Sequence, residues 1–213
     1  DLSIHLTKGD QVIFGDGGLY SHNQNDVGRQ YAKSAWAHST VFPVSQAERR
    51  VKRKGLFKYP ETKLLDDNKI VGQTWLYQPS AILGREVFWG EEDGLKSFWV
   101  LDTVSEGEAG SGQIVSCFLL PAGEANISID KHGGMVSFQL GESKGEIQYN
   151  AEEFDPWFQV GGGDKADKPN AAPIISKKMG NNTPATRLEF YWKKGASKVA
   201  FQVRVGNNGG GKQ

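Results

Sequence analysis

The fold class is indicated most clearly by residues 70–104, IVGQTWLYQPSAILGREVFWGEEDGLKSFWVLDTV. It contains three runs rich in Val, Ile, Phe, Tyr and Trp, and the segments between them carry Gly, Pro, Asp and Ser. Apolar and aromatic runs bounded by turn-forming residues are typical of antiparallel strands. Such runs recur about every ten residues along the chain, at residues 11–14, 40–44, 70–77, 82–89, 97–104, 114–120, 125–129, 135–140, 146–149, 188–192 and 199–205. The pattern predicts an all-β fold, a large antiparallel β-sandwich of two sheets with a supersandwich-like arrangement.

Helical patterns are nearly missing from the sequence. No long stretch carries the i, i+3, i+4, i+7 spacing of apolar residues that marks an amphipathic helix. Only residues 26–37 are expected to form a short helix, with Asn25 or Asp26 as its N-cap.

The chain is expected to form one domain. We predict a single β-sandwich domain over residues 1–205 and a flexible, glycine-rich tail over residues 206–213. The glycine triplet at residues 161–163 opens the longest irregular stretch, which runs through about Pro184 and is predicted to be a surface loop.

The composition supports a core and excludes some partners. Hydrophobic residues make up 38% of the chain, including 6 Trp and 11 Phe, which is enough to build a packed interior. Lys and Arg total 25 and so do Asp and Glu, so no net field favours nucleic acid or an anionic membrane. The single cysteine, Cys117, cannot form an intrachain disulfide.

No apolar run reaches the ~18 residues of a membrane span. Residues 1–5 lack a starting Met and a signal-peptide pattern, so we expect a processed product or a fragment.

Few residues carry a recognisable catalytic or metal-binding pattern. No Gly-x-Ser-x-Gly elbow is present. The histidines His5, His22, His38 and His132 are too dispersed for a zinc signature, so we expect no metal or cofactor, although ligands from distant strands could still meet. The glycines of residues 15–18 follow a strand but lack the lysine of a phosphate-binding loop, which favours a simple turn.

Two further sets of residues have a functional and a structural interpretation. The basic run RRVKRK, residues 49–54, could attract an acidic polysaccharide or only keep a sheet edge soluble. Trp36, Trp89 and Trp157 could stack on sugar rings, but tryptophan in a β-rich chain usually belongs to the core.

Arg85 and Asp102 lie on two neighbouring predicted strands. A buried aspartate needs a partner, and an arginine supplies one. We therefore expect these residues to form a structural ion pair.

Motifs in a fixed order resemble the C-terminal β-sandwich region of the heparinase II/III-like polysaccharide lyases. The matching segments, which together cover nearly the whole chain, are Asp1-Leu2-Ser3, Ile13-Phe14-Gly15-Asp16-Gly17-Gly18-Leu19-Tyr20, Arg29-x-Tyr31, Ala37-His38-Ser39-Thr40-Val41, Arg85-x-Val87, Trp99-Val100-Leu101-Asp102, Trp157 and Lys168-Pro169-x-x-Ala172-Pro173. Two departures stand out beside the histidine. Ser39 replaces the family's asparagine, and Thr40 stands where some metal-binding relatives have a second histidine, so a zinc site of that kind is not expected. Gly17 replaces a proline in the turn, a change that we expect to be harmless.

The resemblance implies a function. Members of this family cleave uronate-containing, acidic polysaccharides by β-elimination, with most catalytic groups on an N-terminal α/α toroid and one histidine on the sandwich. His38 matches that histidine, as a base or as a donor to the substrate. Tyr20, Arg29 and Tyr31 are its candidate substrate-binding neighbours. The substrate is expected to be a glycosaminoglycan, alginate or another uronate polymer.

The resemblance also implies partners and a location. The helical toroid of the same protein is the expected partner, and the location is expected to be periplasmic or secreted. The chain alone is expected to have little or no lyase activity, because catalytic groups that work as a unit fail together. The alternatives are a noncatalytic carbohydrate-binding module, which would not need His38, and a purely structural sandwich that mediates assembly.

Overall fold

The structure is a computed structural model of the chain. It describes residues 2–18, 27–47, 61–77, 81–92, 95–105, 113–121, 126–160, 173–178 and 181–207. Tyr20, the basic run at residues 49–54, the Lys168-Pro169 motif and residues 208–213 lie outside the described residues.

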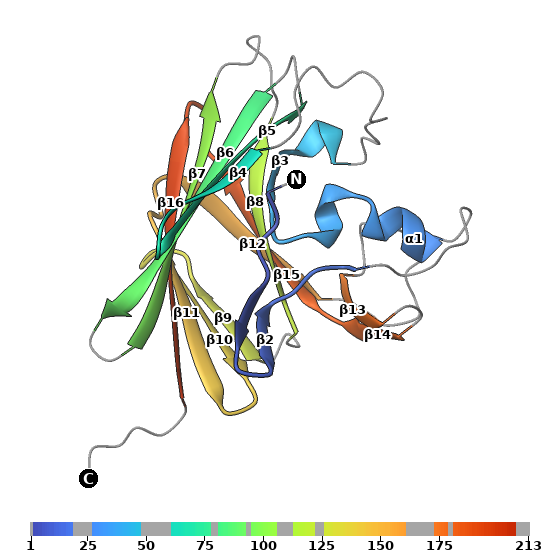
Figure 1. Ribbon diagram of the computed structural model, residues 1–213, viewed down its shortest axis with the longest axis vertical. Helices are drawn as coiled ribbons and strands as arrows, with labels where there is room; N and C mark the ends of the chain where they lie inside the picture. Colours follow the sequence, from blue (N-terminus) through green and yellow to red (C-terminus); the bar gives the residue numbers. More distant parts are fainter. Residues whose placement is uncertain are drawn as a thin grey trace.

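Two antiparallel sheets form a sandwich, as the sequence predicts (Figure 1). The larger sheet has eight strands in the order β4-β5-β6-β7-β16-β11-β10-β9. Their bounds are Glu61–Asp66 (β4), Lys69–Tyr77 (β5), Ala81–Glu92 (β6), Leu95–Ser105 (β7), Lys198–Asn207 (β16), Ser143–Tyr149 (β11), Met135–Leu140 (β10) and Ile127–Asp130 (β9). The smaller sheet has the order β12-β15-β8-β3, with β12 at Phe154–Val160, β15 at Thr186–Trp192, β8 at Ile114–Leu120 and β3 at Val41–Pro43.

Aromatic side chains fill the space between the sheets. Phe118 on β8 and Phe190 on β15 meet Phe201 of the larger sheet with ring centroids 5.1 Å and 5.0 Å away, respectively. Phe154 joins the same cluster, 4.9 Å from Phe201. All seven residues of β8 are buried, as expected for a central strand that is covered on both faces.

An irregular layer covers the face of the smaller sheet that points away from the larger one (Figure 1). We call residues 27–40 and 44–47 the capping layer; it holds helix α1 (Val27–Ala32) and the 3₁₀ turns η1 (Ala35–Ala37) and η2 (Val44–Gln46), which lie before and after strand β3. The predicted helix at residues 26–37 is thus a six-residue helix followed by a separate turn. The helix stops because the Ser34 amide and hydroxyl both donate to the Tyr31 carbonyl, which competes with continued helix hydrogen bonding.

Five strands escaped the sequence pattern. They are β1 (Leu6–Lys8), β4, β12, β13 (Ile174–Lys178) and β14 (Asn181–Pro184). All six residues of β4 are exposed, so the strand is held by pairing with β5 and shows no apolar alternation. The expected surface loop through Pro184 instead contains the β13–β14 hairpin. Likewise β16 continues through Asn207, two residues into the expected tail.

Among the described residues, no helix is both long and apolar enough to cross a membrane.

Candidate functional site

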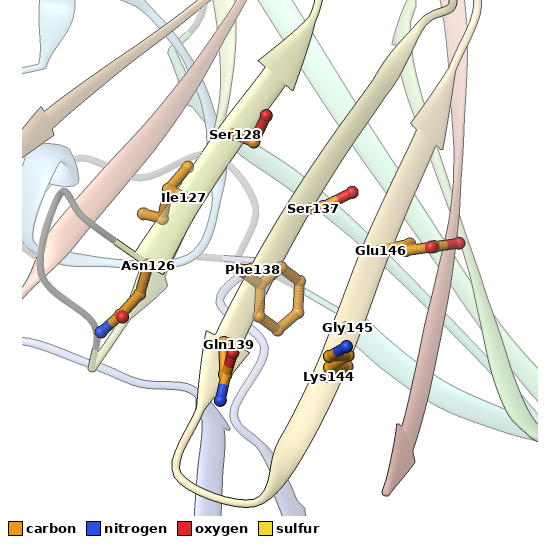
Figure 2. A pocket seen from close by; sticks show the side chains of 9 residues that line it. All are labelled: Asn126, Ile127, Ser128, Ser137, Phe138, Gln139, Lys144, Gly145 and Glu146. Atoms are coloured by element: carbon orange, nitrogen blue, oxygen red, sulfur yellow. The ribbon is translucent and has the colours of Figure 1, made fainter. Parts of the chain in front are cut away.

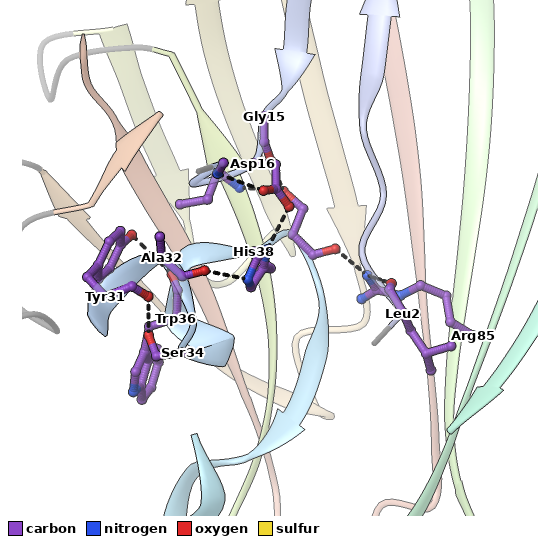
Figure 3. A network of polar contacts seen from close by, with 12 residues as sticks. Leu2, Gly15, Asp16, Tyr31, Ala32, Ser34, Trp36, His38 and Arg85 are labelled. Atoms are coloured by element: carbon purple, nitrogen blue, oxygen red, sulfur yellow. Dashed lines mark hydrogen bonds and ion pairs between the residues drawn. The ribbon is translucent and has the colours of Figure 1, made fainter. Parts of the chain in front are cut away.

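His38 lies at the end of η1, at the boundary between the capping layer and the sandwich (Figure 3). Its backbone amide donates to the Ala35 carbonyl and so closes the 3₁₀ turn. The side chain is 17% exposed, which leaves part of the ring open to solvent. The ring Nδ1 lies 2.6 Å from Oδ2 of Asp16, and Nε2 lies 3.1 Å from the carbonyl oxygen of Ala32. Both ring nitrogens therefore have a partner.

Asp16 is the residue that sequence reasoning missed. It belongs to the turn after β2 (Gln11–Phe14), and its other carboxylate oxygen accepts the Gly18 amide at 2.8 Å. Burial acts to raise the pKa of Asp16, but the hydrogen bond and charge of His38, the Gly18 amide and the charge of His5 together bring that pKa below its ordinary value. The carboxylate is thus ionised at neutral pH and can only accept hydrogen bonds. The one available signal was the aspartate of the family's turn motif.

The partners of the His38 ring limit the role that each ring nitrogen can take. A carboxylate and a backbone carbonyl are both acceptors, whereas a neutral imidazole carries only one N–H. Both contacts are hydrogen bonds at the same time only when His38 is protonated on both nitrogens. With both hydrogen bonds made, neither ring nitrogen of His38 keeps a free lone pair.

A close approach of two backbones holds Asp16 beside His38. The Gly17 amide donates to the Ala37 carbonyl at 2.6 Å. A Cβ atom at Gly17 would lie 2.7 Å from the Ala37 Cβ and 2.8 Å from its carbonyl oxygen, closer than real Cβ contacts allow. Gly17 was expected to be a harmless replacement for proline. The structure gives it a defined role, since a proline has no amide to donate and would carry a side chain into Ala37.

Ser39 joins this turn to the smaller sheet. Its hydroxyl donates to the Gly15 carbonyl at 3.0 Å and accepts the Leu119 amide at 2.9 Å, and the residue is fully buried. Where the family has an amide side chain next to the histidine, this chain has a hydroxyl that is already used inside the protein.

Arg85 and Asp102 form the predicted structural ion pair. Arg85 donates from Nε and from Nη2 to the two carboxylate oxygens of Asp102, at 2.6 Å and 2.7 Å, and both side chains are buried. The remaining terminal nitrogen of Arg85 donates to the carbonyl oxygens of Leu2 and Ser39, at 3.2 Å and 2.7 Å. The pair therefore also fixes the backbone beside His38.

The predicted substrate-binding neighbours of His38 fall in different places. Tyr31 lies at the end of α1 and is buried, and its hydroxyl donates to the Trp36 carbonyl at 3.2 Å. In this structure Tyr31 supports the turn before His38 from within. Arg29 lies on the same helix and is half-buried. Tyr20 lies outside the described residues, and contact of these three residues with a substrate stays a prediction.

The tryptophans considered for sugar stacking give a mixed result. Trp36 is a core residue, packed edge-on against Phe42 with ring centroids 4.8 Å apart. Trp89 is half-buried, and the side chain of Trp157 lies outside the described residues. Trp36 is therefore not available for sugar stacking, and stacking on Trp89 or Trp157 stays a prediction.

Two hollows on the larger sheet are lined by residues other than His38. One of about 380 Å³ lies on β9, β10 and β11 and is lined mainly by polar side chains such as Ser137, Lys144 and Glu146 (Figure 2). Another of about 260 Å³ lies over Gly72 and Gly84 of the larger sheet. Within the described part of the chain, no three His, Cys, Asp or Glu side chains are grouped as metal ligands would be.

The fold resembles parts of solved lyases, although neither a family model nor a curated protein matches the sequence. A heparinase III, the BT4657 gene product, matches with a TM-score of 0.68 at 18% identity, over 95% of this chain and 29% of that chain. Heparan sulfate lyase HepC from Pedobacter heparinus matches with a TM-score of 0.68 at 18% identity, over 99% of this chain and 31% of the lyase. This chain has the fold of one region of these lyases. It spans less than a third of their length, and the structural resemblance that its motifs indicated is confirmed.

Proposed function

We propose that this chain is the β-sandwich part of a polysaccharide lyase that cleaves a uronate-containing polysaccharide by β-elimination. The observation that carries the proposal is the partly exposed His38 ring, which is paired with the partly exposed carboxylate of Asp16. The fold likeness supports the substrate class, because one matching structure is a heparan sulfate lyase. The other catalytic groups, an N-terminal helical toroid that carries them and a periplasmic or secreted location belong to the same proposal.

β-Elimination needs three functions around the uronate. A donor or cation neutralises the carboxylate, a base removes the proton from C5, and an acid protonates the departing O4 oxygen. The proton on C5 is weakly acidic, so the developing negative charge on the carboxylate must be stabilised as that proton leaves. His38 can serve only those functions that its protonation allows.

The geometry favours His38 as a donor over His38 as the base. A base would need a free lone pair on one ring nitrogen, but Nδ1 faces a carboxylate and Nε2 faces a carbonyl oxygen. With both hydrogen bonds made, neither nitrogen has a lone pair to take the C5 proton. A uronate carboxylate or the O4 oxygen would take the place of the Ala32 carbonyl at Nε2. A hydrogen bond to a carboxylate is stronger than one to a backbone carbonyl, which favours a uronate carboxylate at this position.

The test measures unsaturated uronate by ultraviolet absorbance, with the intact protein that contains this chain and with heparan sulfate, alginate and other uronate polymers as substrates. We expect His38→Ala to lower kcat by about 10²- to 10⁴-fold, the usual contribution of a proton-transferring side chain. His132, which lies in an exposed turn, provides the control, and His132→Ala should leave kcat unchanged. If His38→Ala keeps the full rate, His38 has no catalytic role. Saturable polymer binding without any unsaturated product would instead support a noncatalytic binding module.

The pH profile separates the two roles of His38. If His38 is a donor, the part of kcat that depends on it falls as the ring loses its proton with rising pH. If it is the base, that part rises over the same range. The comparison of wild type with His38→Ala at each pH isolates this part from the other groups.

A further inference from the structure

A buried charged pair lies beneath the turn that carries His38. Arg187 and Glu189 on β15 are only 2% and 1% exposed, and the Arg187 Nε donates to Glu189 at 2.7 Å. Leu188, which lies between them in sequence, and Phe190, which follows, pack into the core. Because successive residues of a strand point to opposite faces, the Arg187–Glu189 pair projects from the other face of the smaller sheet. That face is the one that the capping layer covers (Figure 1).

Arg187 contacts the capping layer at Trp36. Its guanidinium lies 4.7 Å from the centroid of the Trp36 ring, and it also donates to the Trp36 carbonyl oxygen at 3.4 Å. The same carbonyl accepts the Tyr31 hydroxyl. The Trp36 carbonyl oxygen in η1 thus accepts hydrogen bonds from Arg187 on β15 and from Tyr31 on α1.

The two residues that flank this contact lead directly to His38. Trp36 precedes it by two residues, within the turn that the His38 amide closes. Tyr31 is followed by Ala32, whose carbonyl faces Nε2 of His38. A shift of Trp36 or Tyr31 would therefore move the ring itself or its Nε2 partner.

We propose that Arg187 is a positioning residue that orients His38 through Trp36, and that Glu189 holds Arg187 in place for this purpose. The Tyr191 hydroxyl donates to the second carboxylate oxygen of Glu189, so the carboxylate is fixed from two sides. Burial of two charges is costly, and an apolar pair of similar size often packs equally well. An apolar pair could not stack a cation on Trp36 or donate to its carbonyl. The catalytic consequence of this role rests on the proposed function, but the positioning itself does not.

The test observes the His38 ring directly, by NMR of the ring N–H protons in the folded protein. Such protons are detected when they are hydrogen-bonded and exchange slowly with water. We expect Arg187→Lys, which keeps the charge but loses the planar stacking and the fork of donors, to speed exchange of the His38 ring protons about five- to tenfold. The partly exposed Arg204, which pairs with Glu92 on the larger sheet, provides the matched control, and Arg204→Lys should change nothing at His38.

A second variant keeps the test decisive if Arg187→Lys does not fold. Arg187→Met/Glu189→Gln removes both charges together, so no buried charge is left unpaired. It should fold and should show the same faster exchange at His38. Unchanged exchange in a folded variant of either kind would overturn the positioning role. In the intact lyase, the loss should appear in kcat and not in KM; absence of any lyase activity would refute the proposed function while the NMR result still decides the positioning.

Discussion

Replacing Arg85 with methionine tests how much the buried ion pair of the larger sheet stabilises the fold and the backbone beside His38. Arg85 makes four hydrogen bonds, two to Asp102 and one each to the carbonyls of Leu2 and Ser39. Arg85→Met removes all four and leaves the carboxylate of Asp102, which has no exposed surface, without its counter-charge. Removing one partner of a buried pair costs about 3–5 kcal/mol, a large share of the total stability of a domain.

A double variant separates the cost of the unpaired Asp102 charge from the cost of the lost hydrogen bonds to the backbone carbonyls. Arg85→Met/Asp102→Leu leaves no unpaired charge and should recover roughly half of the loss. Recovery should be incomplete, because the Leu2 carbonyl still loses its donor, at a cost of about 1–3 kcal/mol. The Ser39 carbonyl suffers less, since it also accepts the Ile4 amide.

Urea unfolding followed by tryptophan fluorescence measures these differences, with the slope of the transition as a check that the unfolded state is unchanged. The control is Lys69→Met at the Lys69–Glu86 pair, which is about one-third exposed on both sides. An exposed pair of this kind contributes about 0–1 kcal/mol. If Arg85→Met lowers the unfolding free energy by no more than Lys69→Met does, or if the double variant is less stable than the single one, the reasoning is wrong.

Three further predictions concern the turn beside His38. Gly17→Ala should lower the unfolding free energy by about 1–3 kcal/mol in thermal unfolding, because its Cβ overlaps Ala37; an unchanged Tm would contradict the close approach. Ser39→Ala leaves a buried amide and a buried carbonyl unpaired, so urea unfolding should show a loss of about 1–3 kcal/mol, and a neutral effect would argue against this bridge. The pKa of Asp16 is lowered in the fold, so its contribution is present above the ordinary carboxyl pKa of about 3.9 and is lost as the pH falls through the lower folded value. Unfolding measured from pH 6 to pH 2 should show a shallower loss of stability in Asp16→Asn than in wild type, and identical slopes would refute the pairing with His38.

The strands could be predicted where burial imposes a pattern. Strand β8 is apolar along its whole length and β10 alternates, and both coincide with the predicted runs at residues 114–120 and 135–140. Strand β4 carries Glu, Lys and Asp at exposed positions and is specified by its pairing with β5. Strand β12 includes Pro156, which is tolerated because β12 is an edge strand. Pairing between strands is a property of the fold, so these two strands left little signal in the local sequence.

The candidate site was less predictable than the fold. His38 was identified from the motif order, but its partners depend on contacts between segments far apart in sequence. Asp16 is 22 residues away, in a turn that gave no functional signal of its own beyond the family motif. Arg187 lies 151 residues from Trp36, and its position next to η1 follows from the packing of the capping layer on β15. Residue type and spacing indicate which side chains can do chemistry; the hydrogen bonds that decide their protonation come from the tertiary structure.

Both sheets of the sandwich act on the backbone around His38. Arg85 of the larger sheet donates to the Ser39 carbonyl, and the Leu119 amide of the smaller sheet donates to the Ser39 hydroxyl. On the other side of the ring, Arg187 holds the Trp36 carbonyl. The smaller sheet therefore holds Trp36 before His38, and both sheets hold Ser39 after it, so the direction of the ring depends on how the two sheets pack. A donor that must meet developing charge gains most when its position is set before the substrate arrives. In the function that we propose, the sandwich would use this arrangement to hold one partly exposed histidine as a preorganised donor.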